Sequence, residues 1–256
     1  MRRTRQPRRA VQLSLDEARR PTGRGGWRPR AGRRPGRTTC SHGAREHFAA
    51  RHPQHVTLRV VPGVASLRRE RAVKVVRRAI EAGGRADAFR VVHFNVQGNH
   101  LHLLCEADGA TALARGMQGL NVRLARGLNA VLGRKGTLFA ERYHARTLRT
   151  PREVRTVLRY VLLNARRHAS ERGETLSRYW LDPYSTAPWF DGWRQRIRAD
   201  EPWLQALVAR PCPAARARTW LLTAGWRLWG LLDVDDVPGP STRRGHAAGA
   251  TLVTIG

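Results

Sequence analysis

The stretch FRVVHFNVQGNHLHLLC, residues 89–105, decides the fold of this chain. It contains two largely apolar runs, at 89–97 and 100–105, and the dipeptide Gly98-Asn99 joins them. Two such runs separated by a two-residue Gly-Asn turn predict an antiparallel β-hairpin. The segments on either side of this hairpin then define the rest of the fold.

The flanking segments alternate between strand and helix patterns. A β-branched run at 55–61 predicts a strand, and Ser66 predicts the start of a helix that ends before Gly83-Gly84. After the hairpin, a 3–4 spacing of apolar residues predicts a helix over 109–132, and 137–147 reads as a strand or a short strand pair. A helix from Thr150 follows. This order predicts an α+β fold, a ferredoxin-like split βαβ unit whose antiparallel sheet carries its helices on one face.

The helix that begins at Thr150 has clear start signals. Thr150 is the expected N-cap, Pro151 takes the first helical position, and Glu153 completes a capping box. Tyr160 and Asn164, four residues apart, share a helical face that lies away from the apolar stripe. A half-exposed tyrosine and a surface asparagine would explain the same pattern. The apolar stripe consists of Val154, Val157, Leu158, Val161 and Leu162.

The charge balance is the first indication of a partner. The 256 residues include 48 Lys+Arg against 19 Asp+Glu, a formal net charge of +29, and lysine occurs only at Lys74 and Lys135. Arginine makes fixed, bidentate contacts to phosphate, so this composition predicts a polyanion-binding protein, most often one that binds nucleic acid. Arginine-rich composition inherited from a biased genome is the alternative. At 41% hydrophobic residues, the chain also has enough apolar material for a core.

Several classes of protein are excluded. The chain has no run of roughly 18–20 apolar residues that would span a bilayer and no apolar signal-peptide core at its basic N-terminus. The three cysteines are far apart with no C-x-x-C pair, which argues against a disulfide framework and a four-cysteine zinc site. A zinc cluster at Cys40, His42, His47 and His52 would fit no familiar spacing. A reducing, cytoplasmic setting is therefore expected.

Composition divides the chain into four parts. Residues 1–50 carry 14 arginines against three acidic residues and predict a disordered basic arm that adds non-specific phosphate affinity. Residues 52–170 form the predicted folded domain. An aromatic, proline-interrupted extension with a last helical stretch at 219–232 occupies 171–237, and 238–256 is the predicted disordered tail.

Two sets of polar residues are candidates for function. His100 and His102 alternate along one strand and so point to the same face, where two imidazoles can chelate one divalent ion. With ten histidines in the chain the H-x-H spacing alone is weak, but its position directly after a hairpin turn strengthens it. On the 109–132 helix, the face opposite the apolar stripe is either an ordinary solvated face or a DNA-binding face. It carries Arg115, Gln118, Arg126 and Asn129.

Three segments together resemble a known family. QGNHLHLL at 97–104 resembles the P-N-H-x-H-L-L segment of single-tyrosine HUH transposases of insertion sequences, and GTLFAERYH at 136–144 resembles their next motif. RYVLLNAR at 159–166 resembles the Y-x-x-x-N-P-x-x-A signature of the REP-associated tyrosine transposases. Order and spacing agree across about 52–170. The chain departs from the motifs at Gly98 and Ala165, where the family often has proline.

The resemblance implies a site and a reaction. His100 and His102 would be metal ligands, Asn164 a third ligand through oxygen, and Tyr160 the nucleophile. With Mg²⁺ or Mn²⁺, such an enzyme attacks a phosphodiester of single-stranded or hairpin DNA at palindromic repeat ends, giving a 5′-phosphotyrosine and a free 3′-hydroxyl. The expected protein is a monomer or homodimer without membrane contact, in the bacterial cytoplasm at the nucleoid.

Other readings stay open beside this one. A domesticated DNA-binding protein would use the same basic surface without cleaving DNA. A histidine-triad hydrolase would need a further histidine where Leu104 stands, and a two-histidine phosphoesterase would need a second H-x-[ST] strand beside the first. Tyr143 is the alternative nucleophile within the family-like region.

Overall fold

The computed structural model describes residues 46–197 and 200–239. Residues 1–45, 198–199 and 240–256 lie outside the described residues, and most of the predicted basic arm and tail falls on them. The described part contains a five-stranded sheet in the order β2-β3-β4-β1-β5, in which all paired strands run antiparallel. The strands are β1 (Gln54–Arg59), β2 (Arg85–Ala86), β3 (Phe89–Val96), β4 (His100–Ala107) and β5 (His144–Thr147).

The central hairpin forms where the sequence predicts it. Val96 pairs with Leu101, and the Gln97 amide donates to the His100 carbonyl at 2.9 Å, so Gly98 and Asn99 make the turn. β1 pairs with both β4 and β5 and lies between them. Apart from the short edge strand β2, this is the strand order of a ferredoxin-like split βαβ unit. The predicted α+β fold class is therefore confirmed.

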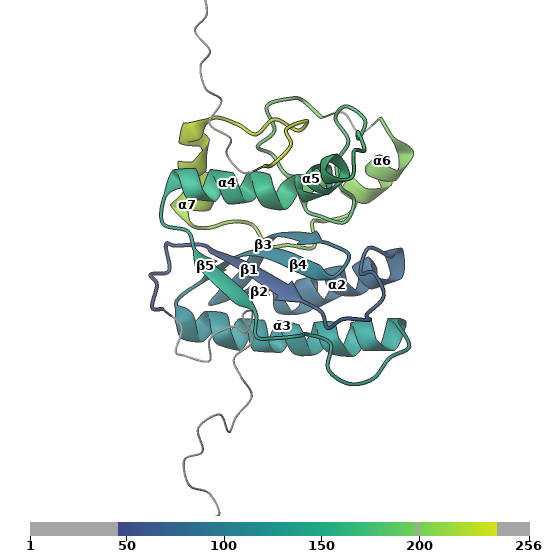
Figure 1. Cartoon of the computed structure of the whole chain (residues 1–256). Coiled ribbons are helices and arrows are strands. Elements are labelled where there is room, and N and C mark those ends of the chain that lie inside the picture. Colours follow the sequence, from purple (N-terminus) through teal and green to yellow (C-terminus); the bar gives the residue numbers. More distant parts are fainter. Residues whose placement is uncertain (1–45, 198–199, 240–256) are drawn as a thin grey trace, which may run out of the picture. The chain divides into compact units, whose positions relative to one another are not determined.

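Helices cover both faces of this sheet (Figure 1). α2 (Glu70–Gly83) and α3 (Ala110–Val131) pack on one face, as expected, and α4 (Pro151–Leu162) packs on the other. The expectation that all helices share one face is wrong for α4. The reason is visible in β4, whose Leu101 and Leu103 enter the core beneath α2 and α3 while Leu104 enters a second core beneath α4. A strand with apolar residues on both faces needs cover on both.

The helix that begins at Thr150 is shorter than the sequence suggests. Its capping box is present, with the Thr150 hydroxyl accepting from the Glu153 amide at 3.2 Å and the Glu153 carboxylate accepting from the Thr150 amide at 3.2 Å. The helix then breaks at Leu163, whose backbone has φ −109° and ψ 15°, and resumes as α5 (Asn164–Glu171). Tyr160 therefore lies in the last turn of one helix segment, and Asn164 begins the next.

The extension packs on α4 and completes the second core. Trp226, which is 1% exposed, packs there with Val154, Val157 and Leu158 of α4. The predicted helix over 219–232 is instead two short segments, α7 and a 3₁₀ turn, because Ala224 leaves helical geometry between them. The elements of the extension are η1 (Ala187–Trp189), α6 (Pro202–Val208), α7 (Trp220–Thr223) and η2 (Gly225–Trp229).

Buried carboxylates connect the extension to the sheet. Asp182 is 2% exposed and accepts two hydrogen bonds from Arg68, both 2.9 Å long, and one from Asn95 at 3.2 Å. Glu106 at the end of β4 accepts from Arg90 and from the first backbone amides of the α7 region. These buried ion pairs and hydrogen bonds thus attach the extension to the sheet.

Candidate active site

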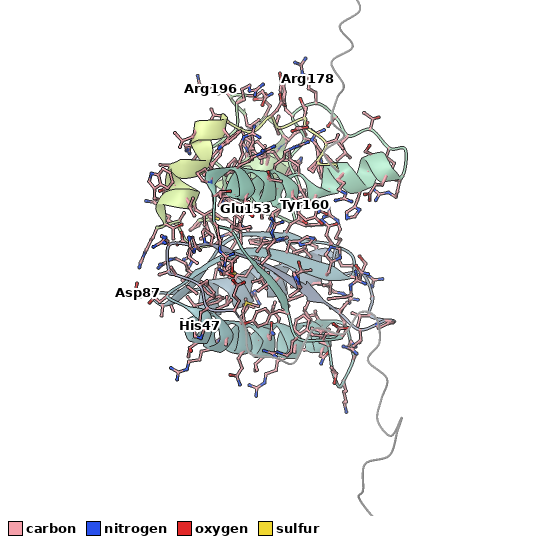
Figure 2. The ribbon with its side chains drawn as sticks, turned by 60° about the vertical axis from the view of Figure 1, so that its left-hand side comes forward. His47, Asp87, Glu153, Tyr160, Arg178 and Arg196 are labelled. Atoms are coloured by element: carbon pink, nitrogen blue, oxygen red, sulfur yellow. The ribbon has the colours of Figure 1, made fainter. Side chains whose placement is uncertain are left out.

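The two motif histidines meet beneath α4. His100 and His102 alternate along β4 and point to the α4 side of the sheet, and their Nε2 atoms are 3.0 Å apart. Tyr160 comes down from α4, with its hydroxyl 3.3 Å from His102 Nε2 (Figure 2). The rings of His102 and Tyr160 meet edge to face at 5.0 Å. The structure therefore brings together three of the predicted site residues.

Neighbouring side chains lie within hydrogen-bond distance of the Nδ1 atoms of both imidazoles. The Nδ1 atom of His100 lies 2.7 Å from Asn99 Oδ1, which can only accept, so Nδ1 carries the proton and Nε2 keeps its lone pair. The Nδ1 atom of His102 lies 3.2 Å from both the Thr57 hydroxyl and His55 Nε2. Partners of this kind fix the orientation and tautomer of a metal-binding histidine.

These supporting residues were missed by the sequence reasoning. Thr57 pairs directly with His102 across β1 and β4, and His55 lies two residues away on the same face. The signal that could have found them is the alternation of His55 and Thr57 along the first strand. It becomes informative only once the register between β1 and β4 is known.

Burial keeps this cluster uncharged. Burial, together with a smaller effect of nearby positive charges, lowers the pKa of His100 to about 4 and that of His102 to about 2. Burial also lowers the pKa of His55 to about 4, with His144 and Arg146 adding to the effect. A histidine with such a pKa is neutral near pH 7, which is the form that ligates a metal ion.

Asn164 is the fourth predicted site residue. It is fully buried at the start of α5, and among the described residues neither of its amide atoms has a hydrogen-bond partner. A buried amide without partners is costly unless a ligand completes it. The Asn164 side-chain oxygen, four residues after Tyr160, is thus available as a metal ligand and makes no direct hydrogen bond to either imidazole.

The donor set fits a divalent cation. Two ligands about 2.1 Å from one ion and at right angles to each other lie about 3.0 Å apart, which is the separation of the two Nε2 atoms. In residues 46–197 and 200–239, no group of three or more His, Cys, Asp or Glu side chains is arranged to hold a metal. A donor set of two imidazoles and one amide oxygen has a different composition, because it contains only two residues of these types.

The predicted DNA-binding residues of α3 lie elsewhere. Because α3 and α4 cover opposite faces of the sheet, Arg115, Gln118 and Arg126 are exposed on the far side from Tyr160. Asn129 is engaged within the fold, where its amide donates to the Gly136 carbonyl at 2.8 Å and accepts from Arg134 at 2.9 Å. The structure therefore does not join this set to the histidine cluster.

Tyr143, the alternative nucleophile, lies in the other core. It is 7% exposed and packs in the cluster formed by the sheet with α2 and α3. That cluster occupies the face of β4 opposite His100 and His102. Tyr160 is therefore the tyrosine that the fold brings to the histidines.

Comparisons with known proteins gave a family match and a similar solved structure. The family model of IS200-like transposases matches residues 55–164, a range that includes His100, His102, Tyr160 and Asn164. A solved structure of a REP-associated tyrosine transposase bound to a REP hairpin is similar at 15% identity and a TM-score of 0.44, covering 57% of this chain and 82% of that one. A comparison with curated protein sequences gave no significant match. No helix in the described part of the chain is long and apolar enough to cross a membrane. Residues 55–164, 110 of the 256 residues, are thus similar to the IS200-like transposases.

Proposed function

We propose that this protein cleaves and rejoins single-stranded or hairpin DNA with Tyr160 as the nucleophile. The observation that carries the proposal is the 3.3 Å contact between the Tyr160 hydroxyl and His102 Nε2, beside a second imidazole at 3.0 Å. A tyrosine in an ordinary helix–sheet contact does not require two neutral histidines beside its hydroxyl. The family match supports the same reaction class.

The chemical step conserves bond energy. The Tyr160 oxygen attacks the phosphorus and loses its proton to solvent, while the bond from phosphorus to the 3′-oxygen breaks and that oxygen gains a proton. The products are a 5′-phosphotyrosine and a free 3′-hydroxyl. Attack by another 3′-hydroxyl reverses the step, so rejoining needs no nucleoside triphosphate.

The side chains of the site prepare this attack. His100, His102 and Asn164 would hold Mg²⁺ or Mn²⁺, which polarises a non-bridging phosphate oxygen and offsets developing charge. Asn99 and Thr57 orient the two imidazoles through Nδ1. The Arg167 guanidinium lies 5.6 Å from the centre of the Tyr160 ring and adds a positive charge beside it.

The wider surface would bind the rest of the DNA. A net charge of +29 favours strong, salt-dependent phosphate binding, and the exposed Arg115, Gln118 and Arg126 would contact DNA beyond the cleaved strand. The tyrosine–asparagine spacing favours the REP-associated branch, hence palindromic repeat ends. Such a protein would act at the bacterial nucleoid as a monomer or homodimer.

The test is the formation of a covalent adduct. With Mn²⁺ and a labelled single-stranded hairpin from the flanks of the gene, the wild-type chain should give a protein–DNA adduct that survives SDS. Tyr160→Phe should abolish the adduct and cleavage, yet leave DNA affinity and the melting temperature near wild type. His102→Ala should also stop cleavage, with partial recovery at high Mn²⁺, and the matched control Tyr179→Phe should cleave normally.

Two outcomes would overturn the proposal. Normal cleavage by Tyr160→Phe would show that another group is the nucleophile. Tight binding of hairpin DNA by the wild-type chain without any adduct, in Mg²⁺ or Mn²⁺, would instead identify a DNA-binding protein that does not cleave.

A further inference from the structure

A cavity of about 430 Å³ opens directly beside His100. Four parts of the chain form it: Arg68, the hairpin turn at 97–100, α5 with the following Arg172, and Leu176 with Trp180 of the extension. The volume is in the range of sites that hold small ligands. Because the family model ends at residue 164, the extension wall of this cavity lies outside the matched domain.

The walls of the cavity combine an aromatic ring with positive charge. Trp180 lines it and is half-buried, and Arg68 and Arg172 line it as well. Among the described residues that line it there is no aspartate or glutamate, although outside the lining Arg68 pairs with Asp182 and Arg172 with Glu174. An aromatic side chain with arginines nearby is the combination that stacks the bases of a single strand and attracts its phosphates.

Contacts outside the cavity hold these walls in place. Arg166, which is 7% exposed, donates to the Trp180 carbonyl at 3.1 Å and to Asp235 at 2.8 Å. Arg68 is paired through two 2.9 Å hydrogen bonds with the buried Asp182. A site whose walls are already fixed loses little ordering entropy when a ligand binds.

Both departures from the family motifs line this same cavity. Gly98 and Ala165 stand where the family often has proline, and each contributes to the cavity wall. Packing does not demand glycine at position 98, since a Cβ there would meet only Ser66 Oγ at 3.6 Å and the backbone is not left-handed. The small side chains of Gly98 and Ala165 therefore leave space in the cavity, and Gly98 is not needed there to avoid backbone strain.

We infer that this cavity binds one nucleobase of the DNA strand, that of the nucleotide next to the scissile phosphodiester. The base stacks on Trp180, and Gly98 and Ala165 make the space for it. The inference rests on the proposed function, because His100 is both a wall of the cavity and a proposed metal ligand. A base in the cavity would hold the neighbouring phosphate at His100, His102 and Tyr160.

The test measures binding, so it does not depend on cleavage. The full chain with Tyr160→Phe is titrated with single-stranded DNA in which one abasic residue is moved through successive positions. Removal of one particular base should weaken binding about tenfold, the effect of one lost stacking contact. Trp180→Ala should weaken binding of the intact strand about tenfold and cause no further loss on that abasic strand.

Matched variants separate the cavity from general effects. Trp180→Phe keeps a ring and should retain most of the affinity, while Trp220→Ala removes an exposed tryptophan, 57% accessible, that does not line the cavity and should change nothing. Gly98→Pro and Ala165→Pro fill the cavity from the other side and should mimic Trp180→Ala. Ala165 is the second residue of α5, a position that tolerates proline.

The outcomes distinguish this inference from the proposed function. If the Trp180→Ala and abasic effects multiply, or if the substitutions at Trp180, Gly98 and Ala165 leave affinity unchanged, the cavity does not hold a base. If the binding pattern is as expected but wild-type protein forms no covalent adduct with the same strands in Mn²⁺, the base site stands and the nucleophile role of Tyr160 fails.

Discussion

Glu106→Gln tests whether the extension and the sheet unfold together. The Glu106 side chain is 1% exposed, and its Oε2 lies 2.7 Å from Arg90 Nε. Its Oε1 accepts from the Thr219 amide at 2.7 Å, and the Arg218 amide lies 3.0 Å from both carboxylate oxygens. Both oxygens are therefore surrounded by donors, and they link β4 to the beginning of α7.

The expected cost follows from this arrangement. Glutamine retains one acceptor oxygen, so one hydrogen bond to a charged or backbone donor is lost, at about 1.5–3 kcal/mol. Its new NH₂ group would face donors, which leaves a buried group unsatisfied at about 1–3 kcal/mol. The Arg90 side chain, 10% exposed, also loses its counter-charge. Together these effects predict a loss of about 3–5 kcal/mol in the free energy of unfolding, as for other broken buried ion pairs.

Urea unfolding followed by two probes makes the measurement. Seven of the eight tryptophans lie in residues 180–229, so tryptophan fluorescence reports on the extension while far-UV circular dichroism reports on the whole chain. The two transitions should coincide and shift together in Glu106→Gln. Glu174→Gln, in an exposed pair with Arg172, should leave the midpoint unchanged. A loss below about 1 kcal/mol, or a shift seen by fluorescence alone, would refute the reasoning.

Two further predictions concern protons and metal. Burial lowers the pKa of His93 from 6.5 to about 4, so between these pH values the unfolded chain takes up a proton that the folded chain does not. The free energy of unfolding should therefore fall as pH drops through this window, by at most about 1.4 kcal/mol per pH unit for this group. Urea titrations from pH 7 to 5 should show that the free energy of unfolding depends less steeply on pH in His93→Asn than in the wild type. An unchanged pH dependence would assign the effect to other groups. Mn²⁺ should raise the melting temperature, because only the folded chain brings the imidazoles of His100 and His102 together. Scanning fluorimetry should show that increase lost in His102→Ala, and an equal increase in both proteins would place the metal elsewhere.

Local patterns were enough to predict much of this protein. The hairpin at 89–105, the capping box at Thr150 and the shared face of His100 and His102 depend on residues at most a few positions apart. Strand alternation and helical periodicity connect such residues directly. For the same reason the position of Tyr160 away from the apolar stripe of its helix was a usable signal, and the structure brings that residue to His102.

Long-range contacts needed the folded structure. Thr57 and Asn99 orient the two imidazoles through hydrogen bonds. Thr57 and His102 are 45 positions apart in the sequence, and only the register between β1 and β4 places them side by side. The attachment of α7 to Glu106 spans more than 110 positions, and no periodic pattern encodes it. The break at Leu163 likewise has no proline or glycine to announce it.

The division has a physical cause. Secondary structure and side-chain direction follow from the covalent geometry of neighbouring residues, so His100, His102 and the helix of Tyr160 can be read from the printed chain. Which face of the sheet each helix covers, and which donors surround Glu106 and Asp182, depend on how two apolar cores share one sheet. The cavity at Trp180 arises in the same way, since its walls come from four parts of the chain that only tertiary packing brings together.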